Sequence, residues 1–165
     1  MTSCTDSSAE ATPTWRRARG VGVSQTVLVV SGPFGPGLAA SQVVAAIARG
    51  LQAGALAPNV CALPAAGAGV QDARALLDAL DFDARMRASR AVVICTRRLQ
   101  ERALAGSVTF EIATRARQSG VPVYAVAAEN ALEPFDARIL DLQLVLQADS
   151  RRALAAAGQK LAAIV

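Results

Sequence analysis

The sequence of 165 residues predicts an α/β fold, namely a doubly wound (Rossmann-like or flavodoxin-like), mostly parallel five-stranded sheet in a single lobe. Two features predict this class. Short apolar runs alternate along the chain with segments of helical period, which is the pattern of right-handed βαβ units. The apolar runs are also continuous, as expected for strands that helices cover on both faces.

The first strand and the first helix have the clearest signals. Residues 26–30 form an apolar run that predicts a buried strand. Residues 38–54 follow with helical period and end at Gly54, shortly before Pro58. Residues 1–24 are rich in small and polar residues without any period, so they predict a mobile tail, and the folded domain is expected over 25–165.

The same alternation continues through the middle of the chain. Residues 59–63 predict a second strand, and residues 71–80 predict a helix with Leu76, Leu77 and Leu80 on one face. Residues 91–95 predict the third strand, because they form another continuous apolar run.

The last elements carry capping and turn signals as well. Residues 107–119 predict a helix that ends before a glycine, and residues 121–126 predict a strand with Pro122 where no N–H is needed. Residues 142–147 predict the fifth strand. Ser150 is expected to cap the final helix over 151–163.

The composition excludes several classes of function. Hydrophobic residues make up 53% of the chain and charged residues 18%, which excludes a disordered protein. Histidine is absent, which excludes His-based catalysis and His metal ligands. The net charge is only +4, the arginines are mostly interleaved with acids, and the apolar runs are short, so neither nucleic-acid nor membrane binding is predicted.

The cysteines indicate a compartment. Cys4, Cys61 and Cys95 are odd in number and widely spaced, which suggests neither a disulfide framework nor a zinc site. A reducing cytoplasm is therefore the predicted location.

Ligands of open α/β sheets bind at the carboxyl ends of the strands. The loop after the first strand contains Gly32, Gly35 and Gly37, whose backbone a phosphate could approach. Pro33 and Pro36 in that loop have no N–H to donate, and the spacing matches no phosphate-binding motif. The loop could bind phosphate or be a tight structural turn, and the prolines favour the structural turn. The loop over 65–69 has only small residues and is expected to be structural.

Another candidate loop follows the third strand. Cys95, Thr96, Arg97 and Arg98 place a thiol and two guanidinium groups at a strand end, where the pKa of the thiol could be lowered. Anion binding by the arginines and a redox role of the cysteine are both hypotheses. The simpler interpretation is that solvated arginines stand beside a buried cysteine.

No catalytic residue and no metal ligand is predicted. The carboxylates of Asp81 and Asp83 lie close in sequence and could bind Mg²⁺, but they are better placed to begin a short helical turn. The seven loop residues named above are therefore the candidate ligand-binding set: Gly32, Gly35, Gly37, Cys95, Thr96, Arg97 and Arg98.

Three stretches of the chain resemble the glycerate kinase family of the two-lobed, ATP-dependent type. Residues 29–38 and 45–51 are similar to the family's opening strand, its D-S-F-K-G-S-L loop and its A-I-x-x-G-L helix. Leu63 and Pro64 lie where the family has L-P-x-A-D-G-G-E-G. Residues 89–128 align without a gap with its A-D-L-V-I-T-G-E-G-R-L-D-x-Q-T and G-V-P-V motifs. The resemblance covers roughly residues 26–147 and implies a doubly wound lobe with the first strand central.

The functional positions of that family have changed in this chain. Its motif acids and lysines correspond here to Gly32, Gly35, Gly67, Val70, Gln100 and Ser107. Its second lobe is missing, because residues 79–83 join the two halves of the first lobe directly. Phosphoryl transfer needs positioned cations and a held Mg²⁺, so kinase activity is not expected.

The resemblance therefore implies a degenerate, single-lobe glycerate-kinase-like protein that binds a small anion or a protein and needs no cofactor. A homodimer or a protein partner would cover the strand-end face that the second lobe covers in the family. The alternative is an ATP-dependent kinase of glycerate or a similar hydroxy acid. That alternative requires ATP, Mg²⁺ and a partner chain that supplies the missing lobe.

Overall fold

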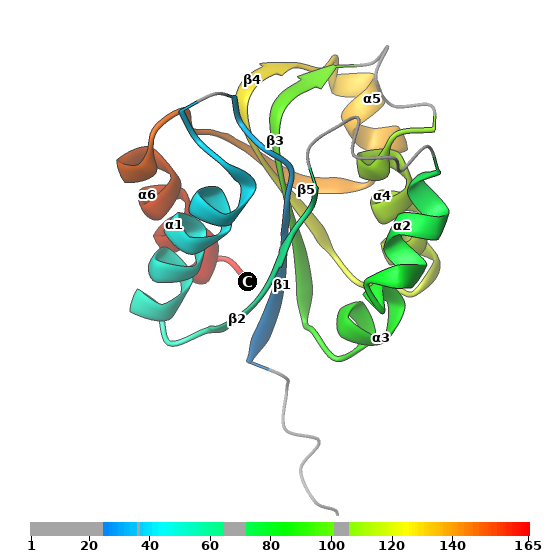
Figure 1. Ribbon diagram of the computed structural model, residues 1–165, viewed down its shortest axis with the longest axis horizontal. Helices are drawn as coiled ribbons and strands as arrows, with labels where there is room; N and C mark the ends of the chain where they lie inside the picture. The colour runs from blue at the N-terminus through cyan, green and yellow to red at the C-terminus, as the bar shows by residue number, and fades with distance from the viewer. Residues whose placement is uncertain (1–24, 36, 65–71, 101–105) are drawn as a thin grey trace, which may run out of the picture.

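The computed structural model describes residues 25–35, 37–64, 72–100 and 106–165. Within them, five parallel strands form one sheet in the order β2-β1-β3-β4-β5, which confirms the predicted fold class (Figure 1). The strands are β1 (Thr26–Ser31), β2 (Ala57–Ala62), β3 (Ala91–Gln100), β4 (Val123–Ala131) and β5 (Leu142–Gln147). β3 is the central strand and β1 lies between it and edge strand β2, so the first strand is not central as the family resemblance implied. The predicted tail 1–24 and the loop 65–69 lie outside the described residues.

Helices cover both faces of the sheet (Figure 1). One face carries α1 (Ala40–Ala53) and α6 (Arg151–Ala162), which lie side by side. The other face carries α2 (Ala73–Ala79), α3 (Phe82–Arg87) and α4 (Val108–Gln118), while α5 (Pro134–Ile139) precedes β5. Each face has its own buried core, because successive side chains of a strand point to opposite sides. Val27, Val29 and Val93 belong to the α1/α6 side, whereas Leu28 and Val92 belong to the other.

Two strands are longer than predicted. The apolar runs predicted that the third strand ends at Cys95 and the fourth near Val126. In the structure, β3 continues to Gln100 and β4 to Ala131. The polar extensions pair with each other, with Arg98 opposite Glu129 and Gln100 opposite Ala131. Residues 95–98 were expected as a loop, and that expectation is wrong, because backbone pairing between neighbouring strands does not require apolar side chains.

Short helices were harder to predict than long ones. Helix α5 was not predicted at all, and none of its residues is buried, so it leaves little apolar period in the sequence. Asp81 does precede a short helix, α3, as expected. Its backbone is left-handed, however, with φ of 50°, and its side chain makes no cap hydrogen bond. Ser150 caps α6 as predicted by accepting a hydrogen bond from Ala153 N.

Candidate functional site

A cavity opens at the carboxyl edge of the sheet, between the ends of β1 and β3, where the strand order reverses direction. It has a volume of about 360 Å³, and α2 and α4 close its far side. We call it the switch-point cavity. It is lined by Val30, Gly32, Pro33, Leu63, Pro64, Leu76, Ile94, Cys95, Thr96, Arg97, Val108, Thr109 and Ile112. Eight of the thirteen are aliphatic residues or prolines, and two threonines and one arginine are among the others.

A second cavity, of about 470 Å³, opens on the α1/α6 side of the same edge. We call it the two-arginine cavity, because Arg97 and Arg151 both line it. The remaining lining residues are Phe34, Gly35, Gly37, Leu38, Ala128, Asp149 and Ser150. Arg97 lines both cavities, so the two spaces meet at the end of β3.

Six of the seven predicted site residues lie at these cavities. Gly32, Cys95 and Thr96 line the first, Gly35 and Gly37 line the second, and Arg97 lines both. Arg98 lines neither. It forms an ion pair with Glu129 at 3.3 Å, and both side chains are more than half exposed. A ligand-binding role for the six residues stays a prediction.

The glycine loop after β1 uses several of its own amide groups. Gly32 N donates to Cys95 O at 3.3 Å, Phe34 N to Leu38 O at 2.9 Å, and Leu38 N back to Gly35 O at 3.2 Å. Pro33 has no N–H at all. Gly35 has φ of 137°, a conformation that side-chain-bearing residues rarely adopt. The described loop therefore has the bonding of a tight structural turn and leaves few amides to cradle a phosphate.

Cys95 is buried rather than reactive. Its side chain is 2% exposed, and desolvation by burial raises the pKa of the thiol far above its ordinary value. The hypothesis of a lowered pKa is wrong, because β3 carries Cys95 into the core. The simpler interpretation, a buried cysteine beside exposed arginines, is confirmed. A thiol that stays protonated at neutral pH is a poor nucleophile.

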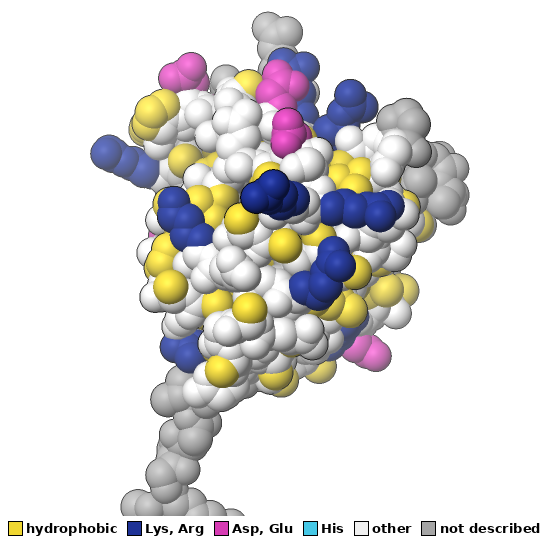
Figure 2. Space-filling view, turned by 90° about the vertical axis from the view of Figure 1, so that its left-hand side faces the viewer, with side chains coloured by type: hydrophobic (Ala, Val, Ile, Leu, Met, Phe, Trp, Pro, Cys, Tyr) yellow, Lys and Arg dark blue, Asp and Glu magenta, His cyan; other side chains and the backbone are white. Residues whose placement is uncertain are grey.

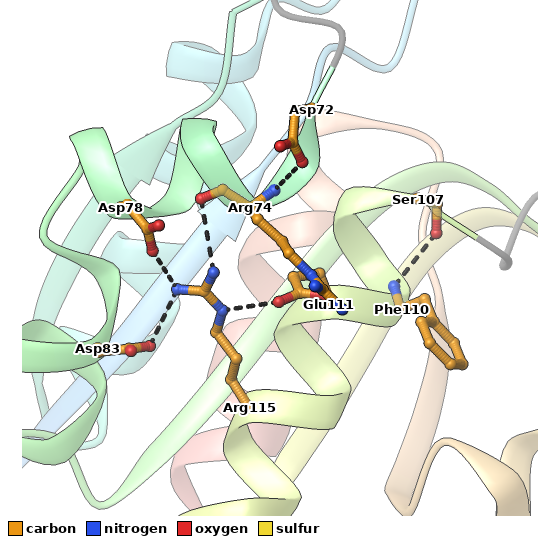
Figure 3. A network of polar contacts seen from close by, with 8 residues as sticks. All are labelled: Asp72, Arg74, Asp78, Asp83, Ser107, Phe110, Glu111 and Arg115. Carbon is orange, nitrogen blue, oxygen red and sulfur yellow. Dashed lines mark hydrogen bonds and ion pairs between the residues drawn. The ribbon is translucent and has the colours of Figure 1, made fainter.

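The wall formed by α2 and α4 is held by a charge network that the sequence did not reveal (Figure 3). Arg115 of α4 donates to Asp78 at 2.7 Å, to Asp83 at 3.3 Å and to Glu111 at 3.0 Å. Burial lowers the pKa of Arg115, but the hydrogen bonds to Asp78 and Glu111 outweigh it, and the net pKa is raised. The guanidinium is therefore charged at every accessible pH. The i,i+4 spacing of Glu111 and Arg115 was the one local signal from which this charge network could have been predicted.

The described ranges contain neither a cluster of metal-binding side chains nor a membrane-spanning helix. No group of three or more acidic, cysteine or histidine side chains there could hold a metal ion. No described helix is both long and apolar enough to cross a membrane.

Comparison with known proteins supports the fold. The chain is similar in structure to a diflavin flavoprotein from Nostoc sp., with a TM-score of 0.50 and 15% sequence identity. The match covers 84% of this chain and 92% of the other. No protein-family model matches, and no curated protein matches.

These comparisons correct the expected function. The glycerate-kinase resemblance predicted a degenerate kinase-like binding module without a cofactor, or else an ATP-dependent kinase. The matched structure is a flavoprotein, which contradicts both readings and the expectation that no cofactor is involved. The resemblance to the glycerate kinase family itself stays a prediction. So does the homodimer or protein partner that was expected to cover the strand-end face.

Proposed function

We propose that this protein binds a flavin in the switch-point cavity and serves in electron transfer. The observation that carries the proposal is the position of the cavity, between the carboxyl ends of β1 and β3 in a sheet of order 2-1-3-4-5. In sheets of this order, ligands bind in the crevice at that point, and flavodoxin-like proteins hold flavin mononucleotide there. The similarity to a flavoprotein adds the class of ligand.

The lining of the cavity fits the ring of a flavin. A volume of about 360 Å³ lies within the usual range of ligand pockets, about 300–1,000 Å³. Leu76 of α2, Ile94 of β3 and Ile112 of α4 offer aliphatic surface to a flat, largely apolar ring system. None of the described lining residues is aromatic, so contact with the ring is aliphatic rather than stacked.

Polar groups at the mouth complete the fit. Arg97 lines the cavity with a guanidinium that has no ion-pair partner among the described residues. Thr96 donates its hydroxyl proton to Arg98 O at 3.4 Å, so its oxygen stays able to accept a hydrogen bond. Thr109 adds a second hydroxyl. These groups match the few polar atoms at the edge of a flavin ring.

The residues of the chain have two tasks in this function. A bound flavin supplies the electron-accepting and electron-donating chemistry. The aliphatic walls exclude water, and Arg97 places a positive charge beside the site, which favours the more negative redox form of whatever is bound. We place this function in the cytoplasm, because the two cysteines within the described ranges, Cys61 and Cys95, are buried free thiols.

The test is reconstitution of the purified protein with riboflavin and with flavin mononucleotide. We expect quenching of flavin fluorescence, a shifted visible spectrum and a changed midpoint potential. Thr109→Trp fills the cavity and should abolish these signals. Gln118→Trp, at the exposed end of the same helix, is the matched control and should leave them unchanged. Absence of any spectral change with both flavins would overturn the proposal.

A further inference from the structure

The sheet ends in two edge strands, β2 and β5, each with one side of its backbone turned away from the other strands. Such an edge can pair with the backbone of another chain, and proteins commonly block it with proline or with charged side chains. The two edges of this protein differ in this respect, because one is blocked and the other is open.

Edge strand β2 is blocked along its outward side. Leu63 N, directly after the strand, donates to Ser31 O of β1 at 2.7 Å, so the alternation of the backbone turns Pro58 and Val60 outward. Pro58 has no N–H to donate. Val60 O already accepts a hydrogen bond from the Arg85 guanidinium at 2.6 Å. A further strand therefore finds neither a full row of donors nor a full row of free acceptors at this edge.

Edge strand β5 carries neither of these blocks. Its sequence, Leu-Gln-Leu-Val-Leu-Gln, contains no charged residue and no proline. Ala148 N donates to Ala127 O of β4 at 2.9 Å, so the same alternation turns the N–H and C=O groups of Val145 and Gln147 outward. Within the described ranges, the backbone of these two residues has no partner beyond the ladder to β4. The edge is ready to pair.

Apolar surface flanks β5 on both faces of the sheet. On the α1/α6 side, a groove of about 380 Å³ lies between Val145 and Leu146 of β5 and three alanines and Lys160 of α6. On the other side, α5 leads into the strand and exposes Phe135 by 70% and Ile139 by 47%. Apolar surface gathered at one place is typical of a site that another chain covers.

The charge of Lys160 indicates which chain this is. Lys160 forms no ion pair within the described ranges, and α1 and α6 contain no acidic residue. Figure 2 shows Lys and Arg side chains spread over this side of the molecule. Helix α6 runs back antiparallel to β5, and its rise of about 15 Å from Ser150 to Lys160 equals about five strand residues. Lys160 therefore lies level with the start of β5.

A second copy of the chain would bring an acid to that level. Antiparallel pairing about a two-fold axis at Leu146 sets Val145 opposite Gln147 of the second copy, so that their outward groups bond to one another. The same register sets Gln143 opposite Asp149 of the second copy, at the level of Lys160. Asp149 is exposed and forms no ion pair within the described ranges.

We propose that two copies of this chain pair antiparallel through β5, with Lys160 of each copy facing Asp149 of the other. The pairing joins the sheets into one of ten strands, five from each copy. This interface uses the edge of the sheet and not its strand-end face. It leaves the switch-point cavity open, because that cavity lies at β1 and β3. The inference goes beyond the proposed function and does not depend on it.

The first experiment measures the dimer dissociation constant of the full chain by sedimentation equilibrium. Lys160→Glu sets two like charges against each other at two symmetric places and should weaken the dimer about tenfold. Adding Asp149→Lys to the same chain exchanges the two charges and should restore the affinity. Arg49→Glu is the matched control, because it makes the same change of charge at an exposed residue of α1, and it should leave the constant unchanged.

The second experiment tests the backbone pairing with Val145→Pro. Since the N–H of Val145 faces away from β4, proline removes one outward donor from each copy and no bond within the copy. The dissociation constant should rise about 10- to 100-fold. Melting curves at a concentration where both proteins are monomeric should coincide.

The outcomes decide the proposal. A monomer at every accessible concentration of the unmodified chain would overturn it. A dimer that Lys160→Glu leaves intact, or that the double variant fails to restore, would also overturn it, because the copies would then meet through another surface. If Val145→Pro does not fold, the exchange of charges decides alone.

Discussion

The two helical layers of this protein are built on different principles. In the α1/α6 layer, small residues bring the helix backbones into direct contact: Gly50 of α1 lies against Ala155 and Gly158 of α6. In the layer of α2, α3 and α4, one guanidinium joins the helices, because Arg115 of α4 bonds to carboxylates on both neighbours. In the first layer the two helices touch backbone to backbone, whereas the second layer adds a directed polar bridge to its buried apolar core.

The difference explains where the switch-point cavity lies. Close backbone contact leaves no space between α1 and α6, and burial of their apolar faces holds them to the sheet. The side-chain bonds of Arg115 hold α2 and α4 together near that residue and leave the two helices apart elsewhere along their length. The cavity lies beyond the bridge, between Leu76 of α2 and Val108 of α4. The Arg115 bridge is thus compatible with a cavity between its helices, whereas the cavity on the α1/α6 side lies only at the ends of the two helices, beside Leu38 and Arg151.

The largest expected effect is on the close-packed layer. A Cβ at residue 50 would overlap the carbonyl oxygen of Ala155 and come within 2.7 Å of Gln159 N, both of them backbone atoms. We expect Gly50→Ala to lower the free energy of unfolding by roughly 3 kcal/mol, since the helices must move apart. Chemical denaturation measures this loss.

The control for this prediction is Gln52→Ala, on the exposed side of the same helix, which should change stability by less than about 0.5 kcal/mol. A Gly50→Ala protein as stable as this control would show that α1 and α6 are not packed backbone to backbone.

A smaller loss of stability is expected when the Arg115 bridge between the helices is removed. Arg115→Met leaves Asp78, Asp83 and Glu111 without their shared partner, and Glu111 is only 15% exposed. We expect a loss of about 1–3 kcal/mol, as for other hydrogen bonds to charged groups. Hydrogen exchange should show the loss in α2 and α4, with α1 and α6 unchanged.

Arg74→Met is the matched control within the same network. Arg74 bonds to Glu111 at 3.4 Å, but its side chain is 75% exposed, so the pair should contribute less than about 1 kcal/mol. If the two variants lose equal stability, Arg115 is not the residue that joins the layer.

The smallest effects concern the two buried thiols, one in each core. Cys95 belongs to the α1/α6 side and Cys61 lies on edge strand β2, against the other layer. In a Cys4→Ser background, a thiol reagent at neutral pH should modify Cys61 before Cys95, because the edge strand opens more readily. Mass spectrometry after partial reaction identifies the site, and faster modification of Cys95 would contradict the comparison.

The pH dependence of stability gives a second test of Cys95. Burial raises its pKa in the folded protein, so the folded state keeps a proton that the unfolded state releases above about pH 8.5. The free energy of unfolding should therefore fall as the pH rises above that value. Cys95→Ala should make the slope shallower, whereas a slope identical to that of the unmodified protein would show that the thiol is not protected in the folded state.

Local signals in the sequence determined the strands and the long helices of this fold, but not the short helix α5. Continuous apolar runs identified the strands, since burial on both faces requires them at every position. Helical periodicity and the cap at Ser150 identified the long helices, because these depend on residues only three or four apart. The same reasoning predicted six residues that now line the two cavities, because the carboxyl ends of parallel strands necessarily meet at one edge.

Contacts between distant residues were decided by the tertiary structure alone. The extension of β3 to Gln100 depends on its pairing with β4, and it carries Cys95 into the core and leaves Arg97 at the meeting point of two cavities. The approach of Gly50 to Gly158 and the bridge from Arg115 to Asp78 join segments that are far apart in the chain. Neither composition nor periodicity contains such pairings, because they arise only when the sheet has brought its helices together.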